Sequence, residues 1–440
     1  MSSPTIAAIS TAPGMGAVAL VRVSGPDGWT AVRRVFDGLK GEPVPRKAYF
    51  GKIRDGQTVI DEVLVTFFRA PASYTGEDLV EIGCHGGVLV SAKVLELLLR
   101  QELHLAEPGE FTQRAFLNGK MDLTQDEAVM DLINAQTPLA LRAATEQLEG
   151  RIGQETNAIR EALLAIAAHL EAYIDFPEEG IDPTIGLALA DQVKAARARV
   201  DSLLATADEG RILREGVRLA IVGKPNAGKS SLLNRLLGYE RAIVSEIPGT
   251  TRDTVEEVAS LHGIPFRIID TAGLRQSEDR IELAGIERTR LAIERADIVL
   301  HVVDATENET VESLSHDKPE VIAFNKVDQL RPPTSDVRNG ISCLTGEGIP
   351  ELVNTLVAQA GASTSTERDS LAAINARHQA CLSRARVSLE TAEAALRNQL
   401  EPELVAVDLR GALTAIAEVT GVIDTEELLG KIFSTFCIGK

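Results

Sequence analysis

The stretch Gly223-Lys-Pro-Asn-Ala-Gly-Lys-Ser230 decides the fold of this chain, because it matches the phosphate-binding pattern G-x-x-x-x-G-K-[ST]. The stretch 218–222 before it, which is apolar after Arg218, is typical of a buried strand, and the stretch 231–237 after it is typical of the start of a helix. Glycines let the backbone wrap around phosphate oxygens, and N–H groups at a helix N-terminus supply positive potential. We therefore expect Lys229 to reach the β- and γ-phosphates of a nucleotide and the Ser230 hydroxyl to bind Mg²⁺.

Two short motifs downstream each follow an apolar run that is typical of a strand. The first is Asp270-Thr-Ala-Gly273, whose aspartate can hold Mg²⁺ through water and whose last N–H can sense the γ-phosphate. The second is Asn325-Lys-Val-Asp328. The Asp328 carboxylate can accept two hydrogen bonds from guanine, whereas adenine would leave a desolvated mismatch. The order of these motifs favours GTP as the nucleotide.

Two further segments complete the pattern of a GTPase. Pro248-Gly-Thr-Thr-Arg-Asp253 lies between the phosphate loop and the Asp270 motif, and its Thr251 can ligate Mg²⁺ as a switch residue. Ser342-Cys-Leu344 occupies the position where GTPases usually carry Ser-Ala-Lys behind the base, so Cys343 and Leu344 are departures from that pattern. Each motif alone is weak, but their order along the chain makes GTP binding a strong prediction.

The composition indicates a globular protein of two or three domains. The chain has 440 residues, of which 44% are hydrophobic and 25% charged. Its net charge of −19 argues weakly against tight, unaided nucleic-acid binding but leaves a local basic patch possible. The four cysteines (Cys84, Cys343, Cys381 and Cys437) have no paired spacing, which argues against zinc or a disulfide framework. With no apolar run of membrane-spanning length, these features predict a cytoplasmic protein.

The hydrophobic pattern divides the chain into four segments. Short strand-like runs dominate residues 1–118 and predict an α+β domain, in which Val88 to about Leu103 should form an amphipathic helix. Residues 119–213 have a helical pattern, in which Ile159, Leu163, Ile166, Leu170 and Tyr173 fall on one stripe. The GTPase motifs occupy 214–362, and a helical pattern resumes over 363–440. We predict a multidomain α/β protein in which a Ras-like, doubly wound P-loop domain is inserted into an all-α helical domain. An α+β domain precedes both.

The GTPase segment lacks the usual side chain that orients the attacking water. Ras-type GTPases carry a glutamine there, but this chain has Leu274. The acidic residues that follow are Glu278, Asp279, Glu282 and Glu287, and the pattern alone does not choose among them. No arginine stands out as a finger for the transition state either.

Several motifs outside the GTPase core point to one family. They are Gly14-Met-Gly-Ala-Val-Ala-Leu-Val-Arg-Val-Ser-Gly25, Tyr74-Thr-Gly-Glu-Asp78, His85-Gly-Gly87, Pro108-Gly-Glu-Phe-Thr-Gln-Arg-Ala-Phe-Leu-Asn-Gly-Lys120 and the terminal Cys437-Ile-Gly-Lys440. With these marks the chain resembles the MnmE (also called TrmE) family of bacterial tRNA-modification GTPases over essentially its whole length.

The resemblance implies a function and a set of partners. The N-terminal domain would form a constitutive homodimer and bind 5-formyltetrahydrofolate or a related one-carbon folate. With MnmG, a flavin- and NADH-using partner, the protein would install an aminomethyl or carboxymethylaminomethyl group at C5 of the wobble uridine, position 34, of certain tRNAs. The GTPase domains would dimerise across their switch faces, with K⁺ in the place of an arginine finger.

The resemblance and the motifs together assign site residues. Glu282, Lys229 and Cys437 are the expected catalytic residues, with Glu282 filling the vacancy at Leu274. Expected Mg²⁺ ligands are Ser230 and Thr251, and expected K⁺ ligands are Asn226, Ser245, Ile247 and Thr250. The expected folate contacts are Arg22, Glu81, Lys120 and Lys440. The expected GTP contacts are Asn226, Ala227, Gly228, Lys229, Ser230, Ser231, Ser245, Glu246, Ile247, Pro248, Gly249, Thr250, Thr251, Asp270, Thr271, Ala272, Gly273, Asn325, Lys326, Asp328, Ser342 and Cys343.

Two other functions compete with this interpretation. An Era-like ribosome-assembly GTPase shares the nucleotide motifs, but it would need a basic RNA-binding module that the acidic C-terminal half does not show. A non-catalytic scaffold could use nucleotide only to dimerise. The intact Lys229, Ser230, Thr251 and Asp270 argue against that scaffold.

Overall fold

The structure is a computed structural model in which two compact units can be described separately. One unit combines residues up to Met130 with those from Thr420, and the other runs from Asp131 to Val419. The structure describes residues 4–175, 183–239, 257–269, 282–307, 312–315, 317–330, 339–361 and 373–422, together with 429, 432, 433, 436, 438 and 439.

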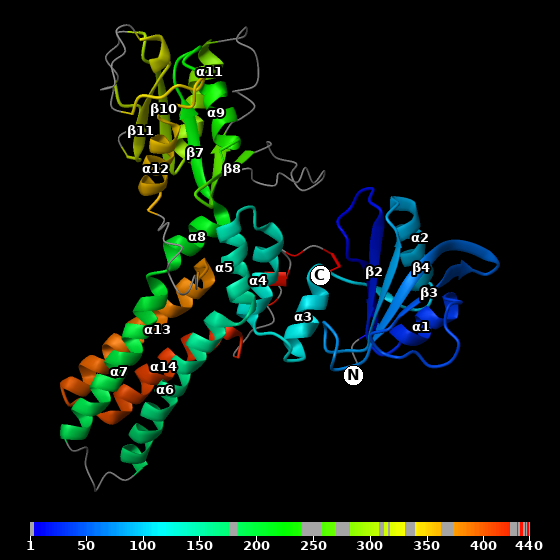
Figure 1. Cartoon of the computed structure of the whole chain (residues 1–440). Helices are drawn as coiled ribbons and strands as arrows, with labels where there is room; N and C mark the ends of the chain where they lie inside the picture. The colour runs from blue at the N-terminus through cyan, green and yellow to red at the C-terminus, as the bar shows by residue number, and fades with distance from the viewer. Residues whose placement is uncertain are drawn as a thin grey trace. The chain divides into compact units, whose positions relative to one another are not determined.

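A six-stranded sheet of order β3-β4-β5-β2-β1-β6 forms the first unit (Figure 1). Its strands are β1 Ile6–Ile9, β2 Val18–Ser24, β3 Ala48–Asp55, β4 Thr58–Phe68, β5 Leu79–His85 and β6 His104–Leu105. Alternate residues of the strands, such as Val21 and Ile82, are fully buried, and they share a core with the helices α1 (Gly28–Val35) and α2 (Val88–Leu99). The period-2 alternation therefore gives the sheet one covered face.

The end of the chain packs against this unit. The helices α3 (Glu110–Leu117) and α4 (Leu123–Asn134) follow the sheet. Leu429, Phe433 and Phe436 form one apolar cluster with Leu123 of α4. Gly439 has a φ of +97°, and a Cβ there would lie 2.3 Å from the backbone oxygen of Ile9, so only glycine fits. We expected residues after 420 within the helical segment 363–440, but their described contacts are with the N-terminal unit.

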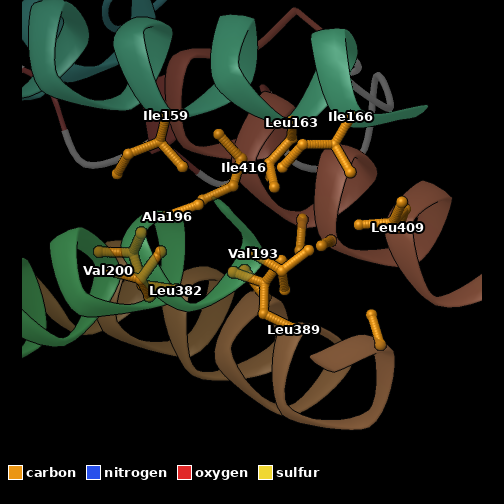
Figure 2. Close-up of a cluster of buried hydrophobic side chains, with 14 of the residues drawn as sticks. Ile159, Leu163, Ile166, Val193, Ala196, Val200, Leu382, Leu389, Leu409 and Ile416 are labelled. Carbon is orange, nitrogen blue, oxygen red and sulfur yellow. The ribbon is translucent and has the colours of Figure 1, made fainter. Parts of the chain in front are cut away.

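Four long helices of the second unit share one hydrophobic core (Figure 2). They are α6 (Arg151–Asp175), α7 (Pro183–Leu204), α13 (Ala376–Arg397) and α14 (Pro402–Thr420), and α5 (Pro138–Leu148) and α8 (Ala207–Glu215) adjoin them along the chain. Ile159, Leu163 and Ile166 of α6 face this core, as their spacing in the sequence predicts. The two helical segments thus form one bundle although 160 residues separate α8 from α13.

Between those helical segments the chain forms a five-stranded sheet of order β11-β10-β7-β9-β8. Its elements are β7 Val217–Val222, α9 Lys229–Leu237, β8 Glu257–Leu261, β9 Ile264–Ile269, α11 Glu282–Arg295, β10 Ile298–Asp304, β11 Glu320–Asn325, the 3-10 helix η2 Val327–Gln329 and α12 Ile349–Gln359. Only β8 is antiparallel to its neighbour, so the carboxyl ends of β7, β10 and β11 meet at one edge. The predicted multidomain α/β fold is confirmed, and in the described residues no helix is both long and apolar enough to cross a bilayer.

Candidate functional site

The phosphate loop lies between β7 and α9, at the carboxyl edge of the sheet. Gly228 has a φ of +97°, and a Cβ there would lie 2.0 Å from the side-chain nitrogen of Asn325. Gly223 is equally constrained, because its Cβ would lie 2.2 Å from the backbone oxygen of Val302. The Lys229 ammonium donates to the Lys224 carbonyl at 2.6 Å, across the loop. The loop backbone and the N-terminus of α9 therefore form a cationic cradle of the kind that binds phosphate.

The other predicted residues of this motif occupy the same loop. Asn226 is exposed and has a φ of +63°, a conformation that asparagine tolerates better than most residues. Ala227 is buried, and Ser230 and Ser231 lie in the first turn of α9. The structure thus brings together Asn226, Ala227, Gly228, Lys229, Ser230 and Ser231.

A buried amide joins the phosphate loop to the predicted base-binding loop. Asn325 at the end of β11 is 3% exposed. Its Nδ2 donates to the Ala227 carbonyl at 2.9 Å, and its Oδ1 accepts from the Cys343 N–H at 3.1 Å. Asn325 therefore fixes the distance between the two loops that would hold the phosphates and the base. Asp328 follows in η2, and the fully buried Ser342 begins the turn of the second loop.

Asp304, at the end of β10, was not among the predicted residues. Its carboxylate accepts from the Lys326 ammonium at 2.6 Å and from the Thr306 hydroxyl at 2.7 Å. Burial alone would raise the pKa of this carboxyl, but the hydrogen bonds from Lys326 and Thr306 hold it below its usual value. An acid at the end of an apolar run, next to a strand that ends in Asn325, was the signal that could have identified it.

Arg235, near the end of α9, is a second residue that the sequence did not reveal. Its Nε donates to the Cys343 carbonyl at 2.8 Å, and its Nη2 donates to the Leu344 carbonyl at 2.6 Å. Burial raises the pKa of the Cys343 thiol to about 11, so the side chain behind the predicted base site is a neutral thiol near pH 7. Arg235 thus ties the base-binding loop to the helix that begins at the phosphate loop.

Several predicted residues lie outside the described part of the chain. They are Ser245, Glu246, Ile247, Pro248, Gly249, Thr250, Thr251, Asp270, Thr271, Ala272, Gly273, Cys437 and Lys440, and Leu274, Glu278 and Asp279 belong to the same group. Glu282 is the first residue of α11, but its side chain and that of Glu287 are likewise outside the description. The proposed roles of all these residues stay predictions.

The N-terminal unit brings two of the predicted folate residues into direct contact. Arg22 of β2 and Glu81 of β5 are cross-strand neighbours, and their side chains form an ion pair at 2.8 Å. The Arg22 guanidinium also lies over the rings of Tyr74 and Phe111, at 5.0 and 5.7 Å from their centroids. Lys120 donates to the Pro71 carbonyl at 3.2 Å. This unit therefore presents a charged pair beside two aromatic rings.

A buried acid in the same unit was also missed. Asp126, in α4, is fully buried, and neither carboxyl oxygen has a hydrogen-bond partner among the described residues. Burial, with smaller contributions from the charges of Asp122 and Glu127, raises the pKa of this carboxyl to about 8. Asp126 therefore carries a proton near pH 7.

Comparison with known proteins shows similarity to one family along the whole chain. The family model described as MnmE helical domain matches residues 123–437, and the one described as GTP-binding protein TrmE N-terminus matches residues 5–120. A protein named tRNA modification GTPase MnmE from Akkermansia muciniphila is 49% identical over 99% of both chains. Proteins of the same name from Geobacter sulfurreducens and Natranaerobius thermophilus are 45% identical over 99% and 43% identical over 100% of both chains.

Proposed function

The chain belongs to the MnmE family of tRNA modification GTPases, and we propose that it hydrolyses GTP to support modification of C5 of the wobble uridine in tRNA. The product would be the aminomethyl or carboxymethylaminomethyl derivative at position 34, made together with MnmG. The observation that carries this proposal is the full-length identity of 40–49% to proteins of that name. The Asn325 network and the phosphate loop, which suit a guanine nucleotide, support the GTPase part.

Nucleoside analysis of tRNA tests the proposal. A host strain that lacks its own copy should contain wobble uridine without the C5 group, and this gene should restore the modified nucleoside. A strain that regains GTPase activity but not the nucleoside would contradict the assignment of the pathway, while leaving the nucleotide site intact.

In the proposed mechanism, this chain's residues bind and orient GTP. Lys229 contacts the β- and γ-phosphates, and Asp328 reads the guanine edge. Ser230 and Thr251 would hold Mg²⁺, which neutralises charge on the phosphates when bound. The hydroxyl of Ser230, in the first turn of α9 beside the phosphate cradle, is a hard oxygen donor that suits this ion.

We propose that K⁺ and dimerisation of the GTPase domains activate GTP hydrolysis. Asn226, exposed on the phosphate loop, offers an amide oxygen for K⁺. Ser245, Ile247 and Thr250 would supply the remaining protein oxygens. Glu282, at the start of α11, would orient the attacking water that Leu274 cannot hold.

The N-terminal unit is the proposed site of the one-carbon folate. An arginine–glutamate pair beside two aromatic rings suits a flat heterocycle with N–H donors and carboxylates. Lys120 and Lys440 would add cationic contacts. Because Gly439 packs against Ile9 of β1, the C-terminal motif adjoins the sheet that carries Arg22, and this supports the inclusion of Lys440.

The open face of the N-terminal sheet supports the proposed homodimer. Val18, Phe50 and Leu64 point away from the helix-covered core and are 67%, 65% and 53% exposed. Phe50 and Leu64 are direct cross-strand neighbours, so they form a continuous apolar surface that a second copy would cover.

The proposed catalytic thiol belongs to the C-terminal motif. Burial raises the pKa of the Cys84 and Cys381 thiols, which makes both poor nucleophiles. Cys437 therefore stays the proposed reactive cysteine. We retain the segments 1–118, 119–213, 214–362 and 363–440 as proposed domains, except that residues from Thr420 group with the N-terminal unit. The cytoplasm stays the proposed location.

A further inference from the structure

The basic residues of the N-terminal domain are concentrated in one short segment. Residues 1–120 contain thirteen basic and thirteen acidic residues, so the net charge of −19 resides entirely in the rest of the chain. Within residues 1–120, the segment 28–54 contains seven basic residues and two acidic ones. A strongly positive segment in an acidic protein is the electrostatic footprint expected for a polyanion.

Local ion pairs engage both acids of that segment. Asp37 pairs with Arg54 at 2.6 Å, and Glu42 pairs with Arg33 at 2.9 Å. Four basic residues then have no carboxylate partner among the described residues. They are Arg34, Lys40, Arg46 and Lys47, and all four are exposed. We call these four residues the cationic edge.

The backbone holds the cationic edge in a fixed place beside β3. Arg33 donates to the Gly41 carbonyl at 3.1 Å, which ties the end of α1 to the loop that carries Lys40. The Asp37 N–H donates to the Lys52 carbonyl at 3.1 Å, and the Arg46 N–H donates to the Phe67 carbonyl at 2.7 Å. Lysines on an edge strand often prevent pairing with the strand of another chain. This role does not explain the cationic edge, because all four of its residues lie outside the edge strand β3.

Arg46, one residue of the cationic edge, lies next to the candidate folate site. The Arg46 guanidinium donates to the Ala72 carbonyl at 3.3 Å, and Lys120 donates to the neighbouring Pro71 carbonyl at 3.2 Å. A uridine that receives a one-carbon unit must approach the carrier of that unit. Its phosphate backbone should therefore meet protein surface next to the carrier site.

We propose that the cationic edge binds the phosphate backbone of tRNA and positions the anticodon region for modification. This proposal rests on the proposed function in tRNA modification. Each phosphate that a lysine or arginine neutralises releases counterions, so the binding should depend on salt concentration.

The test compares two triple variants of the full-length protein. The first is Arg34→Gln/Lys40→Gln/Lys47→Gln; Arg46 stays because it bonds the Ala72 carbonyl. The control is Arg151→Gln/Lys194→Gln/Arg386→Gln, which removes three exposed charges from the helical bundle. Binding of unmodified tRNA is measured at several KCl concentrations, beside GTP hydrolysis and binding to anionic phospholipid vesicles for each variant.

We expect the first variant to lose at least about tenfold in tRNA affinity at low salt. Its slope of log affinity against log salt should fall by about two, because each lost phosphate contact removes roughly 0.7–0.9. GTP hydrolysis should not change, and the control should bind tRNA like the unmodified chain.

Four results would overturn the proposal. Unchanged affinity and slope in the first variant would place the tRNA elsewhere, and equal losses in both variants would indicate a general effect of net charge. Loss of binding to anionic phospholipid vesicles with tRNA binding intact would assign the edge to a membrane surface. If the unmodified chain bound no tRNA at any salt concentration, the tRNA step of the proposed function would fail as well, and this outcome is distinct from the others.

Discussion

The nucleotide end of the α/β domain and the candidate folate site of the N-terminal unit are built differently. In the first, backbone groups of separate loops meet through one buried amide, since Asn325 bonds both Ala227 and Cys343. In the second, Arg22 and Glu81 meet across two strands although they are 59 residues apart in sequence. A site made of loop backbone requires glycines and short polar motifs, whereas a site made of cross-strand side chains leaves no local pattern.

The two sites also differ in burial. Asn325 is 3% exposed, whereas the side chains of Arg22 and Glu81 are 16% and 26% exposed. Loss of a group from a buried network leaves its partners unpaired, but partly exposed groups recover water. We therefore expect larger effects from substitutions in the GTPase domain than in the candidate folate site, and the following experiments test that ordering.

The largest effect should come from Glu282. We expect Glu282→Ala to bind GTP nearly normally but to hydrolyse it about 10²-fold more slowly or worse, even in saturating K⁺. A group that orients water acts in the transition state more than in the bound state, so its loss should appear in kcat. Single-turnover hydrolysis measured beside nucleotide titration separates the two quantities.

The neighbouring acids provide the matched controls for Glu282. Glu278→Ala and Asp279→Ala should both retain nearly normal turnover. If Glu282→Ala hydrolysed GTP normally, or if Glu278→Ala were the inactive variant, another group would hold the water.

Asp126 should be an exception to the expected ordering, because its substitution should have a large effect although it lies in the N-terminal unit. The raised pKa means that the folded protein keeps a proton that the unfolded chain loses above the usual 3.8. Stability from this group is therefore full below about pH 4 and is lost as pH rises toward about 8. Asp126→Asn cannot titrate, so we expect it to be nearly as stable as the parent at pH 4 and more stable at pH 8. The difference at pH 8 should be up to about 5 kcal/mol, because each of the roughly four pKa units between the folded and unfolded states corresponds to about 1.4 kcal/mol.

Urea unfolding followed by tryptophan fluorescence measures this difference. The single tryptophan, Trp29, is 9% exposed in the N-terminal unit and therefore reports that unit's unfolding. Glu102→Gln, which removes an exposed acid of the same unit, should leave the pH profile unchanged. A gap between Asp126→Asn and the parent that stayed constant from pH 4 to pH 8 would show that Asp126 does not titrate in this range.

The sequence predicted the architecture well because its periodic patterns directly reflect packing. The stripe of Ile159, Leu163 and Ile166 faces the bundle core, as expected. The helix expected from Val88 to about Leu103 ends at Leu99 instead, since Glu102 has a φ of +66° and reverses the chain. Boundaries of this kind depend on single backbone angles, which the hydrophobic pattern does not record.

The candidate sites were predictable only in part, for a physical reason. Asn325 and Gly228 belong to motifs because few other residues fit where the loops touch. Arg235 and Asp126 carry no such signature, because an arginine on an exposed helix face and an acid in a helical pattern are common in any sequence. Their importance comes from tertiary contacts and burial, which only the fold supplies.

Arg235 should show a smaller effect than Glu282 within the GTPase domain. We expect Arg235→Ala to weaken the affinity for both GTP and GDP about tenfold, because two hydrogen bonds that hold the base loop are lost. Arg235→Lys should recover part of the loss, since one ammonium cannot reproduce the planar fork. Nucleotide dissociation rates measure the effect, and Arg386→Ala, which removes an exposed arginine of α13, is the control. Normal dissociation from Arg235→Ala would show that Asn325 alone positions the base loop.

The smallest effect should come from Lys120 in the candidate folate site. Lys120 is exposed and bonds a single backbone carbonyl, so water can replace most of what it provides. We expect Lys120→Ala to lower the affinity for 5-formyltetrahydrofolate by about three- to tenfold while the affinity for GTP stays unchanged. Calorimetric titration measures both, with Lys93→Ala as the control because Lys93 is an exposed lysine of α2 in the same unit. Full folate binding by Lys120→Ala would show that Lys120 is not part of the site. A loss of folate affinity larger than the loss of GTP turnover in Glu282→Ala would reverse the proposed ordering. That reversal would mean that the carrier covers Lys120 and excludes water when it binds, so that this partly exposed site becomes as buried as the nucleotide site.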